Sequence, residues 1–261
     1  ASGATSKSDT TKSIFVTAQR GDLLVLEGHY SDSLLPFYKT EVFANATVAP
    51  NGVDFLTFAQ NNELDQPQVL DPTLDLLFSL YNSIYFYNDV RNSGDDPYLL
   101  ESYYPYFRNY LRNNGKLILS CPFPKAVEAL SSNSPVFSLI PVSTQGFGTT
   151  AFQVSVARLN NNRAVNPAAR ATGFPALSSN FAFASIDPFN ITPDGDSLYS
   201  APNIFYTPAN PSASQIIAAR KKNSQGKTNL VYFSVELHKL NGNNQNLQQL
   251  FTHILNNEFN W

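Results

Sequence analysis

Short apolar runs alternate with helix-like segments between residues 22 and 121, and this alternation constrains the fold more than any other feature. The first run, Leu23–Leu26, contains no polar residue, which is typical of a strand buried on both faces. Comparable runs lie in "GVDFLTFA" (52–59), "NSIYFYNDV" (82–90) and "KLILSC" (116–121). A β-α-β-α-β-α-β order predicts a parallel sheet with helices on both faces.

The segments between these runs carry helix signals. In "DPTLDLLFSL", Asp71 is the expected helix cap and Pro72 fits the first helical position. In "DDPYLLESYYPYFRNYLRNNG", large apolar residues recur at helical spacing and Gly115 is the expected C-terminal stop. Pro105 interrupts this pattern, so the third helix either begins near Pro105 or kinks there.

Beyond residue 130 the chain changes character. Residues 131–215 are rich in Ser, Asn, Pro and Ala and carry short β-like runs such as "AFQVSVARL" and "NFAFASI", which indicates an irregular insertion rather than a second domain. "SQIIAARKK" and "TNLVYFSVEL" then predict an antiparallel pair, and "NQNLQQLFTHILNNEFNW" a terminal amphipathic helix. We therefore expect residues 1–19 to be a linker or the tail of an upstream domain, and residues 20–261 to form one α/β domain. Its expected architecture is a three-layer sandwich with a mostly parallel central sheet, flavodoxin-like or amidotransferase-like.

The composition favours an extracytoplasmic protein. Charged residues make up only 14% of the chain and its formal net charge is −3, so no electrostatic argument points to nucleic acid. Neutral amides and hydroxyls supply the polarity instead, as is frequent in secreted proteins. No window approaches eighteen consecutive apolar residues, so we expect no transmembrane segment. The chain contains no methionine, which predicts that the natural start lies upstream.

The order "DLLVLEGH", "FYKTEV", "YNSIYFYND", "YFRNYLRNNGKLILS", "LVYFSVELHKL" and "LQQLFTHILN" resembles the class I glutamine-amidotransferase-like superfamily. More closely, it is similar to the extracytoplasmic, non-catalytic branch found in bacterial surface proteins and lipoproteins. The resemblance covers roughly residues 20–261 and rests on the order of the elements more than on any one motif. It implies an immunoglobulin-like domain upstream, of which "SIFVT" would be the last strand or the linker.

Cys121, the only cysteine, occupies the nucleophile position that this resemblance implies. Catalytic members hold that cysteine in a G-x-C-x-G turn, because the two glycines let the tight turn close. Here Leu119 and Phe123 stand in place of the glycines. The resemblance therefore implies a degenerate nucleophile turn.

The acid-base partner is also altered. The late "F-H-P-E" segment of catalytic members corresponds to Phe233-Ser234-Val235-Glu236, so Ser234 replaces the histidine. His238 would lie on the same side as Glu236 only if the strand continued that far. We therefore expect no enzyme, and keep as the alternative a cysteine-dependent hydrolase or amidotransferase that uses Cys121, Glu236 and His238.

Ligand-binding residues are expected where the parallel strands end. Glu27 and His29 follow the first strand, Asn88 and Asp89 end the third, and Cys121 ends the fourth. Open parallel sheets bind ligands beyond the carboxyl ends of their strands, so these five residues are the candidate crevice. The alternative is that His29, Asn88 and Asp89 cap nearby helices or turns.

Cofactor and metal signals are scarce. The loop "EGHYSDS" has no phosphate-binding fingerprint, so no nucleotide cofactor is expected. We expect no metal site. The alternative is a calcium site in "DPFNITPDGDSLYS", which places the side-chain oxygens of Asp187, Asn190, Asp194 and Asp196 within ten residues. Their spacing differs from the twelve-residue helix-loop-helix calcium pattern, and Asp-Gly is first a turn signal.

Three functions stay open at this point. The first is a non-catalytic extracytoplasmic domain for ligand binding or assembly within a larger secreted or cell-surface protein. Its partners would be a small ligand, a glycan or a protein, together with the upstream domain of the same precursor. The second is the cysteine-dependent enzyme, and the third is a structural subunit of a surface layer or filament that self-assembles.

Overall fold

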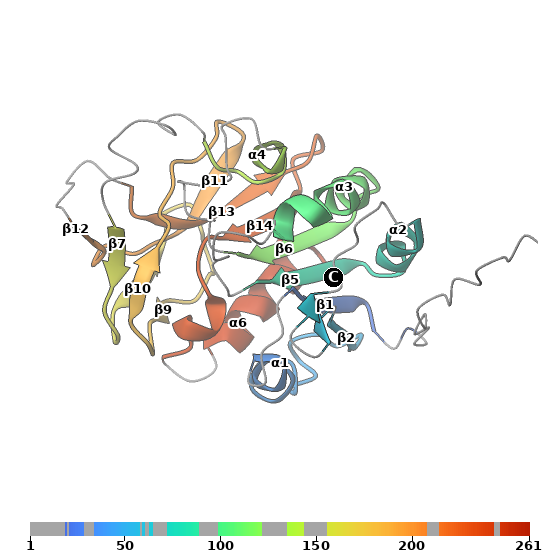
Figure 1. The fold of residues 1–261 in the computed structure, drawn as a ribbon, viewed down its shortest axis with the longest axis horizontal. Helices are drawn as coiled ribbons and strands as arrows, with labels where there is room; N and C mark the ends of the chain where they lie inside the picture. Colours follow the sequence, from blue (N-terminus) through green and yellow to red (C-terminus); the bar gives the residue numbers. More distant parts are fainter. Residues whose placement is uncertain are drawn as a thin grey trace, which may run out of the picture.

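A nine-stranded sheet forms the centre of the fold (Figure 1). The computed structural model describes residues 19, 21–28, 34–57, 59–60, 63–64, 72–88, 99–121, 135–143, 156–207, 214–242 and 246–261. Across the sheet the strand order is β2-β1-β5-β6-β14-β13-β11-β8-β9. The fold is therefore mixed α/β, as the alternation in the sequence predicts. In the described part of the chain, no helix is long and apolar enough to cross a membrane.

One half of the sheet is parallel. Its strands, in spatial order, are β2 (Val53–Thr57), β1 (Leu23–Glu27), β5 (Ser83–Tyr87), β6 (Lys116–Ser120) and β14 (Thr228–Phe233). Every residue of β1 and β5 is buried, which confirms that runs without alternation form strands covered on both faces.

The other half of the sheet is antiparallel, so the sheet is less parallel than the sequence suggests. β13 (Ile216–Lys222) pairs antiparallel with β14, which confirms the predicted hairpin. β11 (Gly195–Ser200), β8 (Ala164–Pro167) and β9 (Leu177–Ser178) continue the sheet by antiparallel pairing. Three strands from the expected insertion region thus join the central sheet through main-chain hydrogen bonds.

The remaining strands form two small sheets. β7 (Val156–Leu159) lies between β10 (Phe183–Ile186) and β12 (Phe205–Thr207). β7 and β10 are the β-like runs recognised in "AFQVSVARL" and "NFAFASI". A short hairpin, β3 (Ala59–Gln60) with β4 (Glu63–Leu64), follows β2.

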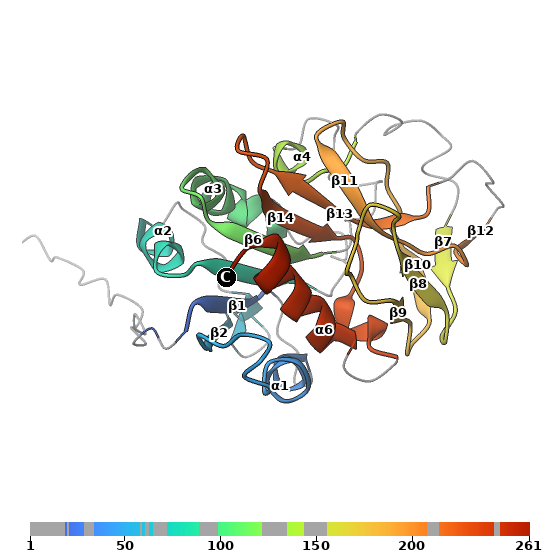
Figure 2. The ribbon, with the colours of Figure 1, turned by 180° about the vertical axis from the view of Figure 1, so that it is seen from behind.

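Helices pack on both faces of the central sheet. α2 (Pro72–Ser79), α3 (Leu99–Arg112) and α4 (Val136–Leu139) share one apolar cluster with one face. The opposite face is covered by α1 (Leu34–Phe37) with its π-helical continuation η1 (Tyr38–Val42), and by α6 (Asn246–His253), which continues as η3 (Ile254–Glu258). Figure 2 shows α6 lying against this second face. Asp71, the predicted cap of α2, lies outside the described residues.

α3 forms where the sequence predicts a helix, but its start and the conformation at its end differ from the prediction. It starts at Leu99, six residues before Pro105, so the alternative in which the helix begins near Pro105 is wrong. The helix ends as expected, but Asn114, not Gly115, has the left-handed φ of 64°. Gly115 is needed for space, because a Cβ there would lie 2.5 Å from the ring of Tyr110.

Candidate functional site

The carboxyl ends of the parallel strands lie side by side, and they place three of the candidate ligand residues in one row. The Asn88 N–H donates to the carbonyl of Ser120 at 2.9 Å, and the Cys121 N–H donates to the carbonyl of Phe233 at 3.0 Å. Glu27 is level with Tyr87 in the pairing of β1 with β5. The other two candidates, His29 and Asp89, lie outside the described residues.

Glu27 and Cys121 nevertheless belong to opposite faces of the sheet. Glu27 follows Leu23 and Val25 on the face covered by α6, whereas Cys121 follows Leu119 on the face covered by α3. The Glu27 carboxylate is 1% exposed and accepts a hydrogen bond from the Tyr87 hydroxyl at 3.0 Å. The row therefore does not bring this carboxylate and this thiol into one crevice.

Cys121 is packed as an apolar residue. Its side chain is 1% exposed and belongs to the cluster that includes Leu119 and Tyr232. Its carbonyl accepts a hydrogen bond from the Tyr232 hydroxyl at 2.9 Å. Buried cysteines in apolar surroundings behave as small hydrophobic residues, and reactive ones sit in accessible, electropositive places.

Ser120 fixes the path of the chain after β14. Its hydroxyl donates to the carbonyl of Val235 at 2.8 Å and accepts from the N–H of Leu237 at 3.3 Å. β14 ends at Phe233, and a 3-10 helix, η2 (Leu237–Leu240), begins four residues later. The strand therefore does not continue to residue 238.

Glu236 and His238 have different partners as a result. The Glu236 carboxylate forms an ion pair with Lys239 at 2.7 Å. The His238 imidazole packs edge-on against Phe37, with ring centroids 6.4 Å apart. The condition under which Glu236 and His238 would share one side of a strand is not met, because the segment that carries them is not a strand.

Two of the four candidate calcium ligands, Asp194 and Asp196, are engaged by cations of the protein itself. Asp194 pairs with Lys221 at 3.0 Å, and Asp196 pairs with Arg220 at 3.3 Å and Lys222 at 3.0 Å. Hydrogen bonds from Thr192 and Lys221 hold the pKa of Asp194 below its usual range, and a hydrogen bond from Lys222 does the same for the pKa of Asp196. Among the described residues, no three or more acidic, histidine or cysteine side chains gather as metal ligands.

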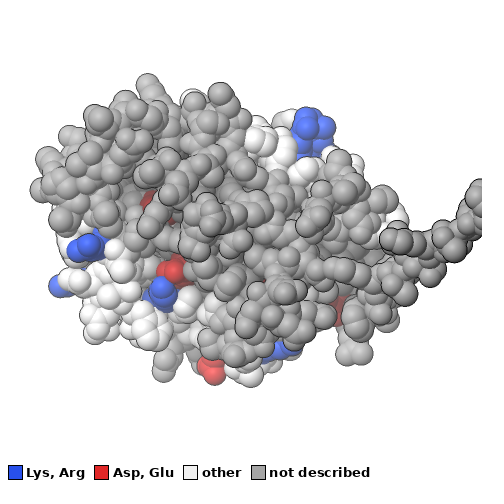
Figure 3. Space-filling model, in the orientation of Figure 1, with Lys and Arg blue, Asp and Glu red and all other residues white. Residues whose placement is uncertain are grey.

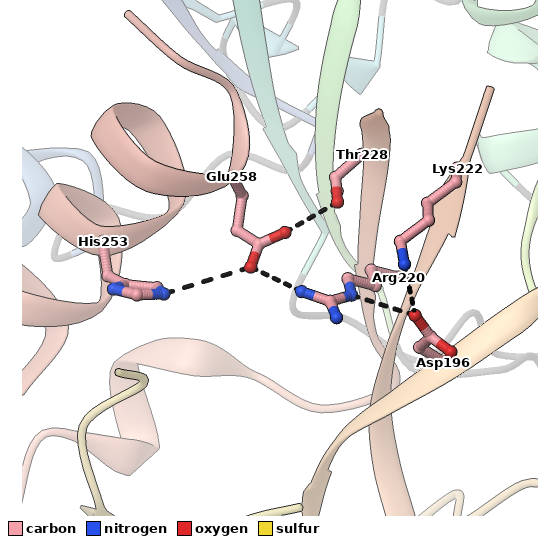
Figure 4. Close-up of polar contacts among 6 residues, drawn as sticks. All are labelled: Asp196, Arg220, Lys222, Thr228, His253 and Glu258. Carbon is pink, nitrogen blue, oxygen red and sulfur yellow. Dashed lines mark hydrogen bonds and ion pairs between the residues drawn. The ribbon is translucent and has the colours of Figure 1, made fainter. Parts of the chain in front are cut away.

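A charged cluster that the sequence did not reveal joins the C-terminal helix to the sheet (Figure 4). Glu258 of η3 is at its centre: one carboxylate oxygen contacts Arg220 of β13 at 2.5 Å, and the other accepts from the Thr228 hydroxyl at 2.6 Å. Arg220 extends the cluster to Asp196 of β11. The His253 Nε2 lies 4.0 Å from Glu258. The cluster joins Asp196, the β13–β14 hairpin and the C-terminal helix, which are separate segments of the sequence, so no local motif could have indicated it.

The geometry of the charged cluster suits a structural role, in which it fixes η3 to the sheet. Both oxygens of Glu258 are engaged, and the side chains of Arg220 and Glu258 are only 13% and 11% exposed. His253 packs on Phe174, with ring centroids 4.4 Å apart, and burial lowers the pKa of the imidazole. The Glu258 carboxylate is thus held between the sheet and its own helix and is largely withdrawn from solvent. We assign the cluster to holding η3 on the sheet.

A pocket of about 510 Å³ opens at the opposite edge of the sheet, where β5 and β6 begin and α2 and α3 end. We call it the amino-edge pocket. The residues that line it are Asp75, Ser79, Tyr81, Asn82, Asn109, Tyr110, Arg112, Asn113, Asn114, Gly115 and Lys116. Five separate elements and turns contribute, which is why sequence reasoning missed it. An excess of Asn in "YFRNYLRNNG" is the only local signal.

Two tyrosines form the buried part of the amino-edge pocket. The Tyr110 hydroxyl donates to the carbonyl of Tyr81 at 3.0 Å, and the Tyr81 hydroxyl donates to Asp54 at 3.1 Å. Burial and the bond to Asp54 raise the pKa of Tyr81 to about 12, and burial raises that of Tyr110 as well. Both phenols therefore stay protonated at neutral pH and offer ring surface rather than acid-base chemistry.

The described charged residues do not form one large patch on the face shown in Figure 3. On the face shown in Figure 3, the described Lys, Arg, Asp and Glu side chains lie singly or in small mixed groups. Large apolar side chains are exposed at Leu76 and Leu80, on and just after α2, and at Phe181 and Phe205. The amino-edge pocket is a hollow among the described residues with the volume to hold a small ligand.

Comparison with known proteins adds a distant fold likeness. No family model matches the chain, and no curated protein matches it. Among solved structures, the crystal structure of a ThuA-like protein from Parabacteroides merdae matches 90% of this chain and 88% of that chain, at 12% sequence identity and a TM-score of 0.44. ThuA has the class I glutamine-amidotransferase-like fold. A likeness at this level says nothing about activity, ligand or cellular location.

Proposed function

We propose that the chain is a non-catalytic, extracytoplasmic binding domain, built on a three-layer α/β scaffold of the amidotransferase-like type. One observation carries the proposal: the residues that would have to do chemistry are used structurally. Cys121 is packed in an apolar cluster, and the Glu236 carboxylate is paired with Lys239. Ser234 stands where catalytic relatives have histidine, and its hydroxyl donates to the carbonyl of Ile217 at 3.3 Å.

The proposal of an extracytoplasmic location rests on composition and on the sequence resemblance. Charged residues make up 14% of the chain, and neutral amides and hydroxyls supply the rest of its polarity, as is frequent in secreted proteins. Fractionation of the native host, followed by detection with an antibody, tests the location. Recovery of the protein from the cytoplasm alone would overturn this part of the proposal.

Thiol chemistry tests the absence of catalysis. A small aromatic disulfide reagent should react with Cys121 far more slowly in the native protein than in the unfolded chain, because the thiol is buried. Cys121→Ala should leave any hydrolysis of glutamine or of activated esters at the background level of the wild type. Rapid native-state labelling together with turnover that disappears in Cys121→Ala would establish the enzyme instead.

Self-assembly is the outcome that would favour a structural subunit. Light scattering on the purified chain distinguishes a binding domain from a structural subunit. A binding domain is expected to remain small, whereas a surface-layer subunit is expected to form large particles. Leu76 is 68% exposed and Leu80 is 52% exposed, so Leu76→Ser with Leu80→Ser is the matched variant. Large particles that dissolve in this variant would support assembly through α2.

A further inference from the structure

We propose that the amino-edge pocket is the ligand site of this domain and that it takes a neutral, hydroxyl-rich small molecule of the saccharide class. The inference rests on the proposed function, because it assumes that the domain binds and does not transform its ligand. The pocket lies at the edge of the sheet opposite the Cys121 end, so it is independent of the expected carboxyl-edge crevice. Its volume of about 510 Å³ is within the range of small-molecule sites.

Three asparagine side chains line the amino-edge pocket with their amides open to solvent. The side chains of Asn82, Asn113 and Asn114 line the pocket and make no hydrogen bond to any part of the chain that the structure describes. Each primary amide offers two N–H donors and one carbonyl acceptor. Adjacent hydroxyls on a sugar ring are donors and acceptors at once, so paired amides match them better than they match an apolar molecule.

The lining carries one acidic side chain, Asp75, and two basic ones, Arg112 and Lys116. Asp75 contributes one negative charge, and Asn109 occupies one of its oxygens at 3.4 Å. Arg112 contributes a positive charge at the rim of the pocket. The Lys116 ammonium donates to the carbonyl of Phe259, and burial lowers its pKa. Lys116 therefore has a partner within the chain, and a bound anion would meet the second oxygen of the Asp75 carboxylate, which favours an uncharged ligand.

The pocket is held in shape before any ligand arrives. Both phenol hydroxyls, of Tyr81 and Tyr110, are committed to hydrogen bonds within the protein, so the rings are fixed. Gly115 packs against the Tyr110 ring closely enough to exclude a side chain, and its N–H donates to the Tyr110 carbonyl at 2.9 Å. A preformed floor lowers the ordering cost of binding, which matters for a small polar ligand.

The test is a titration of the full chain, labelled with ¹⁵N, with glucose, galactose, mannose and N-acetylglucosamine, followed by NMR. At least one of these probes should saturate with millimolar affinity and should shift the side-chain amide signals of Asn82, Asn113 and Asn114. Asn82→Ala and Asn113→Ala should each weaken binding about tenfold, as the loss of one hydrogen bond predicts. Asn203→Ala, at an exposed turn, is the matched control and should bind like the wild type.

The outcomes separate this inference from the proposed function. No saturable shift with any probe, or equal shifts in Asn113→Ala, would overturn the pocket assignment. Saturable shifts around Asn88 and Cys121 instead would also overturn it, while supporting a binding domain with its site at the carboxyl edge. Saturation by glucuronate or sulfate but not by neutral sugars would contradict the charge argument. Chemical conversion of a bound probe would overturn the proposed function and leave the site in place.

Discussion

Arg220 of β13 and Glu258 of η3 form a nearly buried ion pair, with the guanidinium Nη1 and the carboxylate Oε1 2.5 Å apart. The pair is the main polar contact between the C-terminal helix and the antiparallel half of the sheet (Figure 4). Removing one partner of such a pair leaves the other buried and uncompensated, which is more costly than losing the attraction itself.

We therefore expect Glu258→Gln to lower the free energy of unfolding by about 3 kcal/mol, measured by urea denaturation and circular dichroism. The matched control is Asp194→Asn, which breaks a half-exposed pair with Lys221 and should cost less than about 1 kcal/mol. Equal effects of the two substitutions would show that Glu258 is not an anchor.

Stability should fall in mild acid because of His253. Burial lowers the pKa of this imidazole below its ordinary 6.5, with Arg220 adding to the shift and Glu258 opposing it. The unfolded chain therefore binds the proton more readily, and the free energy of unfolding decreases as pH falls below 6.5 toward the lowered pKa. Urea denaturation at about pH 7.5 and about pH 5 should show this loss.

His253→Gln should remove most of that pH dependence. The carboxylates of Asp194 and Asp196 have pKa values lowered below 3.8, so they stabilise the fold above that pH and lose their contribution only in stronger acid. An unchanged slope between pH 7.5 and pH 5 in His253→Gln, at about the same ionic strength, would contradict the assignment.

Gly115 should tolerate no side chain. In Gly115→Ala the new Cβ meets the ring of Tyr110 at 2.5 Å, and we expect a loss of about 1–3 kcal/mol from overpacking. Tyr110→Leu should offset part of that loss in the double variant, because the clash is with the ring. Strictly additive costs in a thermal-unfolding double-mutant cycle would exclude this explanation.

Burial of Cys121 in the apolar cluster should contribute to stability. Cys121→Ser places a hydroxyl in the apolar cluster and should destabilise the protein by about 1–3 kcal/mol, more than Cys121→Val does. Urea denaturation of the two variants measures the difference. A serine variant as stable as the wild type would indicate a polar environment that the packing does not show.

The sequence predicted four of the five parallel strands, because each of them is a run rich in apolar residues; the parallel pairing of β14 with β6 was not predicted. β1, β5 and β6 are recognisable without their neighbours, and so is the apolar face of α3. The strands between 156 and 207 are short and owe their place to distant partners, such as β8 with β11. Which of them join the central sheet, and which form the separate sheet of β7, β10 and β12, could not be predicted from local pattern.

Among the candidate sites, one could be predicted from the sequence and two could not. The row of Glu27, Asn88 and Cys121 at one edge follows from strand ends alone. That Glu27 and Cys121 lie on opposite faces depends on the register of β1, β5 and β6, which places Glu27 level with Ser120, the residue before Cys121. The charged cluster around Glu258 and the amino-edge pocket depend on packing between distant segments, so only a structure could reveal them.

The pairing of β14 with β6 has a consequence for how the chain reaches this state. The Ser120 hydroxyl and the Val235 carbonyl that meet there are 115 residues apart, so the centre of the sheet closes only after a long loop has been ordered. Folding dominated by such contacts is slow. Until β14 arrives, β6 presents the open edge of an apolar strand to other chains, which makes yield on refolding sensitive to protein concentration.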